Sequence, residues 1–207
     1  MRRPLTMLWI TAVVACVLML AACVGKSMPT TYYTLSAIEP APGETPQALP
    51  AGEVSIGIGP VVFPDELDRQ RIVTRSGRNR LEINEFHRWG GTLEANFSRV
   101  LAENVSLLLR NNKVVAQPWE RYFEPDFRVV MDVRRFDGRL GEFASLNATW
   151  MIRKAGVQKP LVVRQTIVQE AIAAEGYDAL VAAQSAAAAT LSREIAAVLQ
   201  KQIAAKP

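Results

Sequence analysis

The chain has 207 residues, 49% of them hydrophobic and 21% charged, and a formal net charge of +4. This length favours one domain, or one domain with a tail. The small net charge gives no indication of nucleic-acid binding, and one histidine with two cysteines is a poor donor set for a zinc site.

The first 22 residues have the pattern of a secretory signal peptide. Arg2 and Arg3 form a positive start, residues 5–20 are uncharged and mostly apolar, and two alanines close the segment. The apolar run is marginal for a membrane-spanning helix, which needs about 20 apolar residues. We therefore expect residues 1–22 to be removed, which leaves 22 basic and 20 acidic side chains.

The two cysteines make this prediction more specific. Cys16 lies inside the apolar run and leaves with it, so Cys23 has no partner for an intrachain disulfide. Leu20-Ala21-Ala22-Cys23 resembles the bacterial lipobox, whose cysteine receives a diacylglycerol and an N-acyl chain. One acyl chain anchors a protein only reversibly and a second signal makes the anchoring stable. We therefore expect Cys23 to hold the mature chain at a membrane, with no cofactor besides these lipids.

The residue after Cys23 bears on which membrane this is. In enterobacterial-type sorting, Asp at this position retains a lipoprotein at the inner membrane, and here it is Val24. The resemblance therefore implies the periplasmic face of the outer membrane. We expect residues 23–30 to form a lipidated tether and residues 31–207 to form a single domain.

Apolar periodicity and turn residues predict the elements of the first half of this domain. Alternating apolar residues indicate strands, and clusters of Pro, Gly and Asn mark loops. In chain order we expect a strand at 31–35, an exposed loop at 39–52 with four prolines, a strand from Val54 that ends near Pro60, a helical turn at 65–69, and a hairpin of strands 72–75 and 80–83.

The second half is predicted to hold two helices and four strands. Apolar residues at steps of three and four predict a helix from Trp89 to Arg110, and Thr92 is its expected N-cap because Gly90 and Gly91 weaken the start. The last helix is about 40 Å long, so its final turns are expected to project or to contact another subunit. The remaining predicted elements are strands at 113–116, 127–136, 146–153 and 161–173, and that helix at 178–205.

Taken together, these elements predict an α+β fold. The last three strands are separated by short turns, so we expect antiparallel neighbours and a mostly antiparallel sheet. Each helix has one apolar stripe, so both main helices are expected to pack on one face of that sheet.

Catalytic residues are scarce in this sequence. His87 is the only histidine, and an isolated base beside Arg88 and Trp89 at a helix entry is rarely catalytic. The chain has no G-x-S-x-G elbow, no Walker motif and no G-x-G-x-x-G. We expect no metal site and no enzyme, and a hydrolase that uses His87 is the weakest of our hypotheses.

The segment 65–88 is dense in charge, with six arginines and five acidic residues. One interpretation is local ion pairing, in which each exposed pair contributes about 0 to 1 kcal/mol. The other is an arginine-rich interface with a partner or a second subunit. Local pairing is favoured, and the candidates for an interface are Arg69, Arg71, Arg75, Arg78 and Arg88.

The order and spacing of several motifs resemble the PqiC (YmbA) family, the auxiliary lipoproteins of MCE-type ABC transport systems. The chain departs from the family pattern at Gly90-Gly91 and Gln70-Arg71. The matching motifs are Tyr32-Tyr33-Thr34-Leu35, residues 56–61, Leu67-Asp68-Arg69, residues 72–75, Arg88-Trp89, residues 99–104, residues 107–109, Pro118-Trp119, residues 146–150, and residues 191–196 of the Ala-rich last helix.

This resemblance implies a function that composition cannot. Such lipoproteins lie under the outer membrane and receive the far end of a periplasm-spanning MCE assembly, which is implicated in lipid movement between membranes and in envelope integrity. The expected partners are an MCE-domain protein of a PqiB-like assembly with its inner-membrane components, the inner leaflet of the outer membrane, and further copies of the chain in a ring. The alternative is a structural envelope lipoprotein that tethers peptidoglycan or a partner and has no transport role.

Overall fold

The computed structural model describes residues 28–39, 54–119 and 123–205. The chain divides into two compact units, Met1–Thr30 and Thr31–Pro207, and every helix and strand described below belongs to the second. The predicted signal peptide, Cys23, residues 24–27 of the tether and residues 40–52 of the predicted loop lie outside the described residues.

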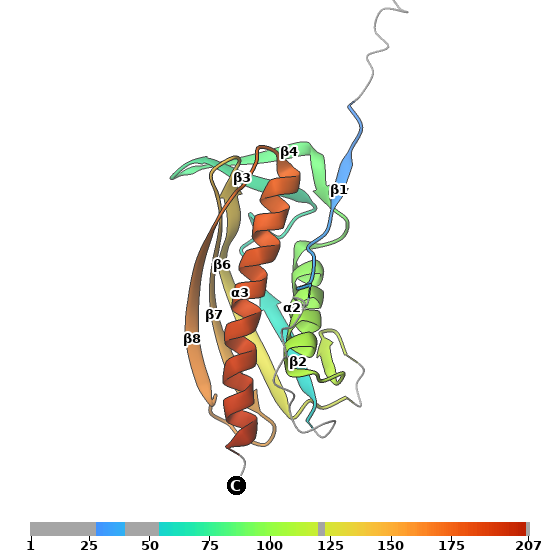
Figure 1. Ribbon diagram of the computed structural model, residues 1–207, viewed down its shortest axis with the longest axis vertical. Helices are drawn as coiled ribbons and strands as arrows, with labels where there is room; N and C mark the ends of the chain where they lie inside the picture. Colours follow the sequence, from blue (N-terminus) through green and yellow to red (C-terminus); the bar gives the residue numbers. More distant parts are fainter. Residues whose placement is uncertain (1–27, 40–53, 120–122, 206–207) are drawn as a thin grey trace, which may run out of the picture. The chain divides into compact units, whose positions relative to one another are not determined.

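The larger of two sheets has five strands in the order β5-β2-β6-β7-β8. Strand β2 runs parallel to both β5 and β6, while β6, β7 and β8 form an antiparallel meander. Figure 1 shows the long strands β6, β7 and β8 side by side. The bounds of these strands are β2 Ile56–Val62, β5 Val114–Ala116, β6 Phe127–Arg139, β7 Phe143–Lys154 and β8 Val162–Ala171.

The smaller sheet has three strands in the order β1-β4-β3. Strand β1 (Thr31–Tyr33) runs parallel to β4 (Arg80–Trp89), and Thr31 pairs with His87. Strand β3 (Arg71–Gly77) forms the predicted hairpin with β4, and both strands are longer than predicted. This sheet therefore joins the N-terminal end of the domain to the β3-β4 hairpin.

The α+β class is confirmed, but the prediction of a mostly antiparallel sheet is wrong, because both sheets are mixed. A period of two identifies a strand without indicating the direction of its neighbour. The chain leaves β2, passes through β3, β4 and the first helix, and returns as β5 and then β6. Such a long crossover brings strands back in the same direction, whereas short turns bring them back reversed.

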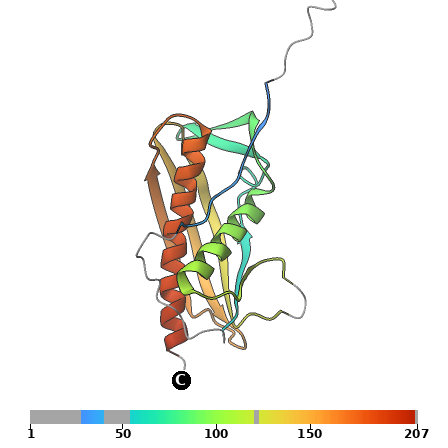
Figure 2. The ribbon, with the colours of Figure 1, turned by 45° about the vertical axis from the view of Figure 1, so that its right-hand side comes forward.

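Two helices pack beside each other on one face of the five-stranded sheet (Figures 1 and 2). Helix α2 (Leu93–Leu109) begins where predicted, because the Thr92 hydroxyl caps it by accepting the Ala95 N–H at 3.2 Å. Helix α3 (Tyr177–Ala204) runs along β6, β7 and β8. The expectation that its last turns project is wrong, because Ile203 in the final turn is only 8% exposed.

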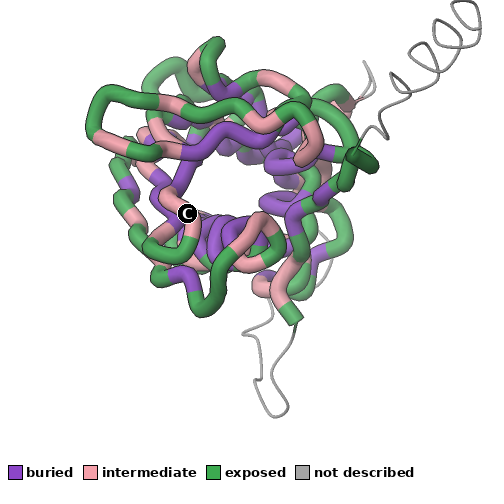
Figure 3. The backbone as a smooth tube through the Cα atoms, turned by 90° about the horizontal axis from the view of Figure 1, so that it is seen from above, coloured by how far each residue is buried: buried purple, intermediate pink, exposed green. Residues whose placement is uncertain are grey.

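The core lies between the helices and the sheet, where buried residues line the inside of the molecule (Figure 3). Phe97 of α2 meets Phe136 of β6 edge to face, with ring centroids 4.9 Å apart. The indole of Trp150 on β7 is fully buried and its N–H donates to Thr166 of β8. Burial of large apolar side chains of this kind is the main stabilising contribution to such a fold.

Of two local predictions for the segment 54–69, one needs correction and one is confirmed. Strand β2 does not end near Pro60 but continues to Val62, with a register shift against β6 between Ile58 and Val61. A proline is tolerated in a strand at such an irregularity, because the ladder there needs no N–H donor. The helical turn predicted at 65–69 is confirmed, because the Asp68 N–H donates to the Pro64 carbonyl four residues earlier and residues 65–67 form a turn.

Candidate functional site

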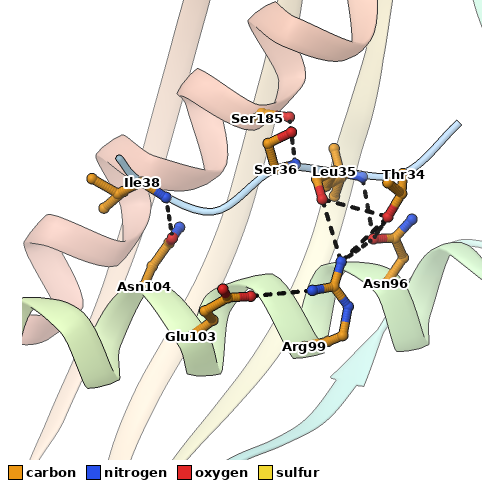
Figure 4. A network of polar contacts seen from close by, with 9 residues as sticks. All are labelled: Thr34, Leu35, Ser36, Ile38, Asn96, Arg99, Glu103, Asn104 and Ser185. Atoms are coloured by element: carbon orange, nitrogen blue, oxygen red, sulfur yellow. Dashed lines mark hydrogen bonds and ion pairs between the residues drawn. The ribbon is translucent and has the colours of Figure 1, made fainter. Parts of the chain in front are cut away.

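Residues 34–38, which we call the strap, cross α2 and α3 after β1 without forming regular structure (Figure 4). Backbone N–H groups of such a segment need partners, and side chains supply them here. Oδ1 of Asn96 accepts the Leu35 N–H at 3.2 Å, and Oδ1 of Asn104 accepts the Ile38 N–H at 2.8 Å. Both asparagines lie on α2, so this helix holds the strap at two points.

The other helix holds the strap as well. Oγ of Ser185 on α3 accepts the Ser36 N–H at 3.1 Å. Asn104, which is 0% exposed, also donates its Nδ2 to Oγ of Ser192 on α3 at 3.1 Å. Buried polar groups that are all paired in this way fix one arrangement of the elements that carry them. The strap and both helices therefore form one hydrogen-bonded unit.

Arg99 on α2 adds a charged contact over the strap. Its Nη2 donates to the Leu35 carbonyl and to the Thr34 hydroxyl, both at 3.3 Å, and its Nη1 pairs with Glu103 at 3.1 Å (Figure 4). The Leu35 side chain is buried in the core. Charge-assisted bonds outside and apolar burial inside thus hold the segment that leads from the domain towards the N-terminus.

His87 belongs to an aromatic cluster with Tyr33 and Tyr177. Its Nδ1 is hydrogen-bonded to the Tyr33 hydroxyl at 2.8 Å, and its ring stacks on Tyr177 with centroids 3.9 Å apart. Burial, followed by the nearby charges of Asp178 and Tyr177, raises the pKa of Tyr33. The cluster ties β1, β4 and the start of α3 together, so its contacts are structural.

Two of the five predicted arginines form local ion pairs, as the favoured interpretation expected, and a third makes a local hydrogen bond. Arg71 and Arg88 share Glu85, at 2.8 and 4.0 Å, and Arg69 donates to the Asp65 carbonyl at 3.3 Å. These three arginines and the residues that they contact therefore lie within the same stretch of sequence. Whether they meet a partner protein stays a prediction.

Arg75 differs from these three, because its partner lies far away in the sequence. Its Nε is 2.6 Å from Oδ2 of Asp137 on β6, whose side chain is 0% exposed. Arg135 binds the other oxygen of this carboxylate at 2.9 Å. Nη1 of Arg75 also donates to the Arg78 carbonyl at 3.1 Å. The buried aspartate thus joins the β3-β4 hairpin to the larger sheet.

An open pocket of about 350 Å³ lies beside this ion pair. We call it the arginine pocket. Two of its residues, Arg75 and Arg78, were among the predicted arginines, whereas Arg135 and Arg139 were missed. Those two lie on β6, and only the tertiary contact of β3 with β6 brings them to the hairpin. The pocket is lined by Arg75, Gly77, Arg78, Arg135, Arg139 and Phe143.

Two further observations on the described residues concern metal ligands and membrane-spanning helices. Among residues 28–39, 54–119 and 123–205, no three His, Cys, Asp or Glu side chains come together as metal ligands. In the same ranges, neither helix has the length and apolar character needed to cross a bilayer.

The fold and the strap define a class of protein: an α+β domain whose two helices clasp the segment that continues towards the chain's N-terminus. The chain belongs to the family described as the ABC-type transport auxiliary lipoprotein component, whose sequence profile matches residues 33–196. This confirms the resemblance to the PqiC (YmbA) family. By this membership the protein is an auxiliary transport lipoprotein.

Solved structures share the fold at low sequence identity. A protein from Xanthomonas campestris is 16% identical, with a TM-score of 0.66 over 84% of this chain and 97% of its own. A protein described only as uncharacterized is 19% identical, with a TM-score of 0.64 over 83% of this chain and 99% of its own. No curated protein matches the sequence.

Proposed function

We propose that the protein is a non-enzymatic component of an MCE-type lipid transport system, anchored by lipid to the periplasmic face of the outer membrane. The proposal rests on the family match over residues 33–196. A diacylglycerol and an N-acyl chain on Cys23 would supply the anchor, because several acyl chains on one residue hold a protein at a bilayer essentially permanently. The folded domain would then be the docking platform for the far end of the MCE assembly.

The strap supports this proposal physically. A lipid anchor resists a partner that pulls on the domain only if the connecting segment is fixed to the fold. Leu35, Ser36 and Ile38 are each bonded through their backbone to a helix side chain. A load on the N-terminus would therefore be shared by α2, α3 and the β1-β4 pair.

The proposed partners are an MCE-domain protein of a PqiB-like assembly, with its inner-membrane components, and further copies of this chain. Copies that share one leaflet stand in the same orientation relative to the membrane normal, which suits a closed ring with a heterologous interface. Arg69, Arg71 and Arg88 are candidates for such an interface, since each keeps part of its side chain in solvent.

Replacing the proposed anchor residue tests the localisation. Cys23→Ala should release the protein from the outer-membrane fraction, because the thioether can no longer form. Cys16→Ala is the matched control, since it removes a thiol from the apolar run and should leave fractionation unchanged. Normal outer-membrane fractionation of the Cys23→Ala variant would refute lipid anchoring.

The alternative function, a structural envelope lipoprotein, predicts different partners. If the protein has the proposed transport role, the purified protein should capture the MCE-domain protein encoded in the same cell. It should not sediment with peptidoglycan sacculi. Retention on sacculi without capture of the MCE-domain protein would favour the structural alternative.

A further inference from the structure

The arginine pocket has a net positive charge that its neighbours do not cancel. Four guanidinium groups line it: those of Arg75, Arg78, Arg135 and Arg139. Among the described residues, the ion pairs of these arginines go to Asp137 and Glu142 only. Four positive and two negative charges leave an excess of two, in a hollow rather than on a flat surface. Such a concave concentration of charge attracts anions.

Two of these arginines also have donors without a partner. The Nε atoms of Arg135 and Arg139 are buried from solvent, and neither has a hydrogen-bond partner among the residues that the structure describes. A guanidinium carries several N–H donors in a planar fork, and the ion pairs to Asp137 and Glu142 use only some of them. Because those Nε atoms are shielded from solvent, the oxygen atoms of an anion in the pocket would accept from the Nη donors that the ion pairs leave unused.

Three of the four arginine side chains have ion-pair partners within the fold before any ligand arrives. Arg75 is fixed by Asp137 and by the Arg78 carbonyl. Arg139 pairs with Glu142 at 2.9 Å and lies over the Phe143 ring, with its guanidinium carbon 5.9 Å from the ring centroid. Ordering flexible side chains is a large part of the cost of binding, so arginines that are already ordered favour affinity.

We infer that the arginine pocket is a binding site for a phosphate group, carried by a lipid headgroup or as the free ion. Arginine forks match phosphate oxygens in pairs, which distinguishes this ligand from a simple halide. A phosphate monoester carries between one and two negative charges at neutral pH, close to the excess of two in the pocket. A single carboxylate would neutralise only half of it.

The proposed lipid anchor would make a lipid headgroup one source of the phosphate. The segment from Cys23 to Thr31 spans at most about 28 Å when extended. Thr31 pairs with His87 on β4, and β4 covers about 23 Å from His87 to Arg80 at the hairpin end. With the proposed anchoring, the length of the tether limits how far the domain, and with it the pocket, can move from a bilayer. This step rests on the proposed anchoring, whereas the phosphate chemistry of the pocket does not.

The test uses the purified full-length protein in a neutral detergent, with three soluble probes. Inorganic phosphate, dihexanoylphosphatidic acid and dihexanoylglycerol, which lacks the phosphate, are titrated by calorimetry. The pocket variant is Arg78→Gln with Arg139→Gln, which spares the Arg75–Asp137 pair. The matched control is Arg134→Gln with Arg164→Gln, which removes the same charge from exposed positions on β6 and β8 outside the pocket.

The expected result is saturable binding of at least one phosphate-bearing probe and none of dihexanoylglycerol. The affinity should fall at least about tenfold in the pocket variant and less than about twofold in the control, because two charge-assisted contacts are lost only in the former. Binding of the lipid probe alone assigns the site to headgroups, and binding of phosphate alone assigns it to the free ion. Equal losses in both variants, or no saturable binding of either phosphate probe, would overturn the inference. Neither outcome depends on whether Cys23 is lipidated.

Discussion

At the scale of single residues, two arginines on β3 show how burial changes the contribution of an ion pair to the stability of the fold. Arg71 and its partner Glu85 are 44% and 57% exposed, so water screens their attraction. Arg75 is 22% exposed and its partner Asp137 is fully buried. Removing one member of a buried pair leaves an uncompensated charge in the interior, which is much more costly than losing a surface pair.

We therefore predict different effects for two equal truncations. Arg75→Ala should lower the free energy of unfolding by about 3 kcal/mol, at the low end for a buried pair because Arg135 still contacts Asp137. Arg71→Ala should lower it by at most about 1 kcal/mol. Urea denaturation of both variants measures the difference, and equal losses would contradict this account.

We predict that Tyr33 makes the folded protein less stable at alkaline pH. Its pKa is raised in the fold by burial and by Asp178 and Tyr177, so the folded state favours the neutral phenol. The stability from this preference is complete below the unfolded pKa of about 10 and declines as pH rises through the folded pKa.

Replacing Tyr33 should therefore make that decline shallower. Tyr33→Phe loses the hydrogen bond to His87 and should have a lower Tm at neutral pH. Its Tm should nevertheless fall less than that of the original protein between about pH 9 and pH 11. The control is Tyr32→Phe, at an exposed neighbouring position, whose pH profile should stay unchanged. If Tm fell equally with pH in all three proteins, Tyr33 would not contribute to the loss of stability at alkaline pH.

At the scale of elements, both helices and eight strands match predicted segments, because periodicity reports which face of each element is buried. Thr92 was identified as the α2 cap because its hydroxyl can replace a missing helix bond locally. Strand direction and the extra length of β4, β6 and β7 were not predictable in this way. The direction of β2 and the extra length of β4 depend on partner strands that are distant in sequence. The extra residues of β6 and β7 instead pair with each other across the turn that joins the two strands.

Helix α3 packs closely because its buried face contains small residues. Ala187 and Ala188 are fully buried, and extra methylenes in a closely packed interface force neighbouring side chains or the backbone to move. Ala187→Leu should therefore destabilise the fold by about 1 to 3 kcal/mol. Ala182→Leu, on the exposed side of the same helix, should change stability by less than about 0.5 kcal/mol. Chemical denaturation distinguishes them, and equal effects would show that the alanine face is not tightly packed.

At the scale of the whole molecule, the proposed function depends on a connection between fold and anchor. The strap would carry that connection together with the β1-β4 pair, and its partners Asn96, Asn104 and Ser185 come from both helices. None of these residues was a candidate in the sequence, because a buried asparagine resembles an exposed one until its neighbours are known. The same limit applies to Arg135 and Arg139 in the arginine pocket.

A transport role predicts a conditional phenotype. Deleting the gene should raise outer-membrane permeability to detergent mainly in cells whose parallel lipid transport systems are also impaired, because redundant routes conceal a single loss. Complementation with the original gene should restore the barrier, and the Cys23→Ala gene should not. Unchanged permeability in the multiple mutant would count against a transport role.

The sequence by itself determined the α+β class, most helix and strand positions, and membership of an auxiliary lipoprotein family. The signal peptide and the anchor at Cys23 stay predictions. Each of these depends on order and spacing along the chain. Only the tertiary structure decided the mixed strand directions, the clasp of the strap between α2 and α3, and the gathering of four arginines around a buried aspartate. These features are contacts between residues far apart in sequence, and a contact acquires its energy from burial and geometry that no local pattern encodes.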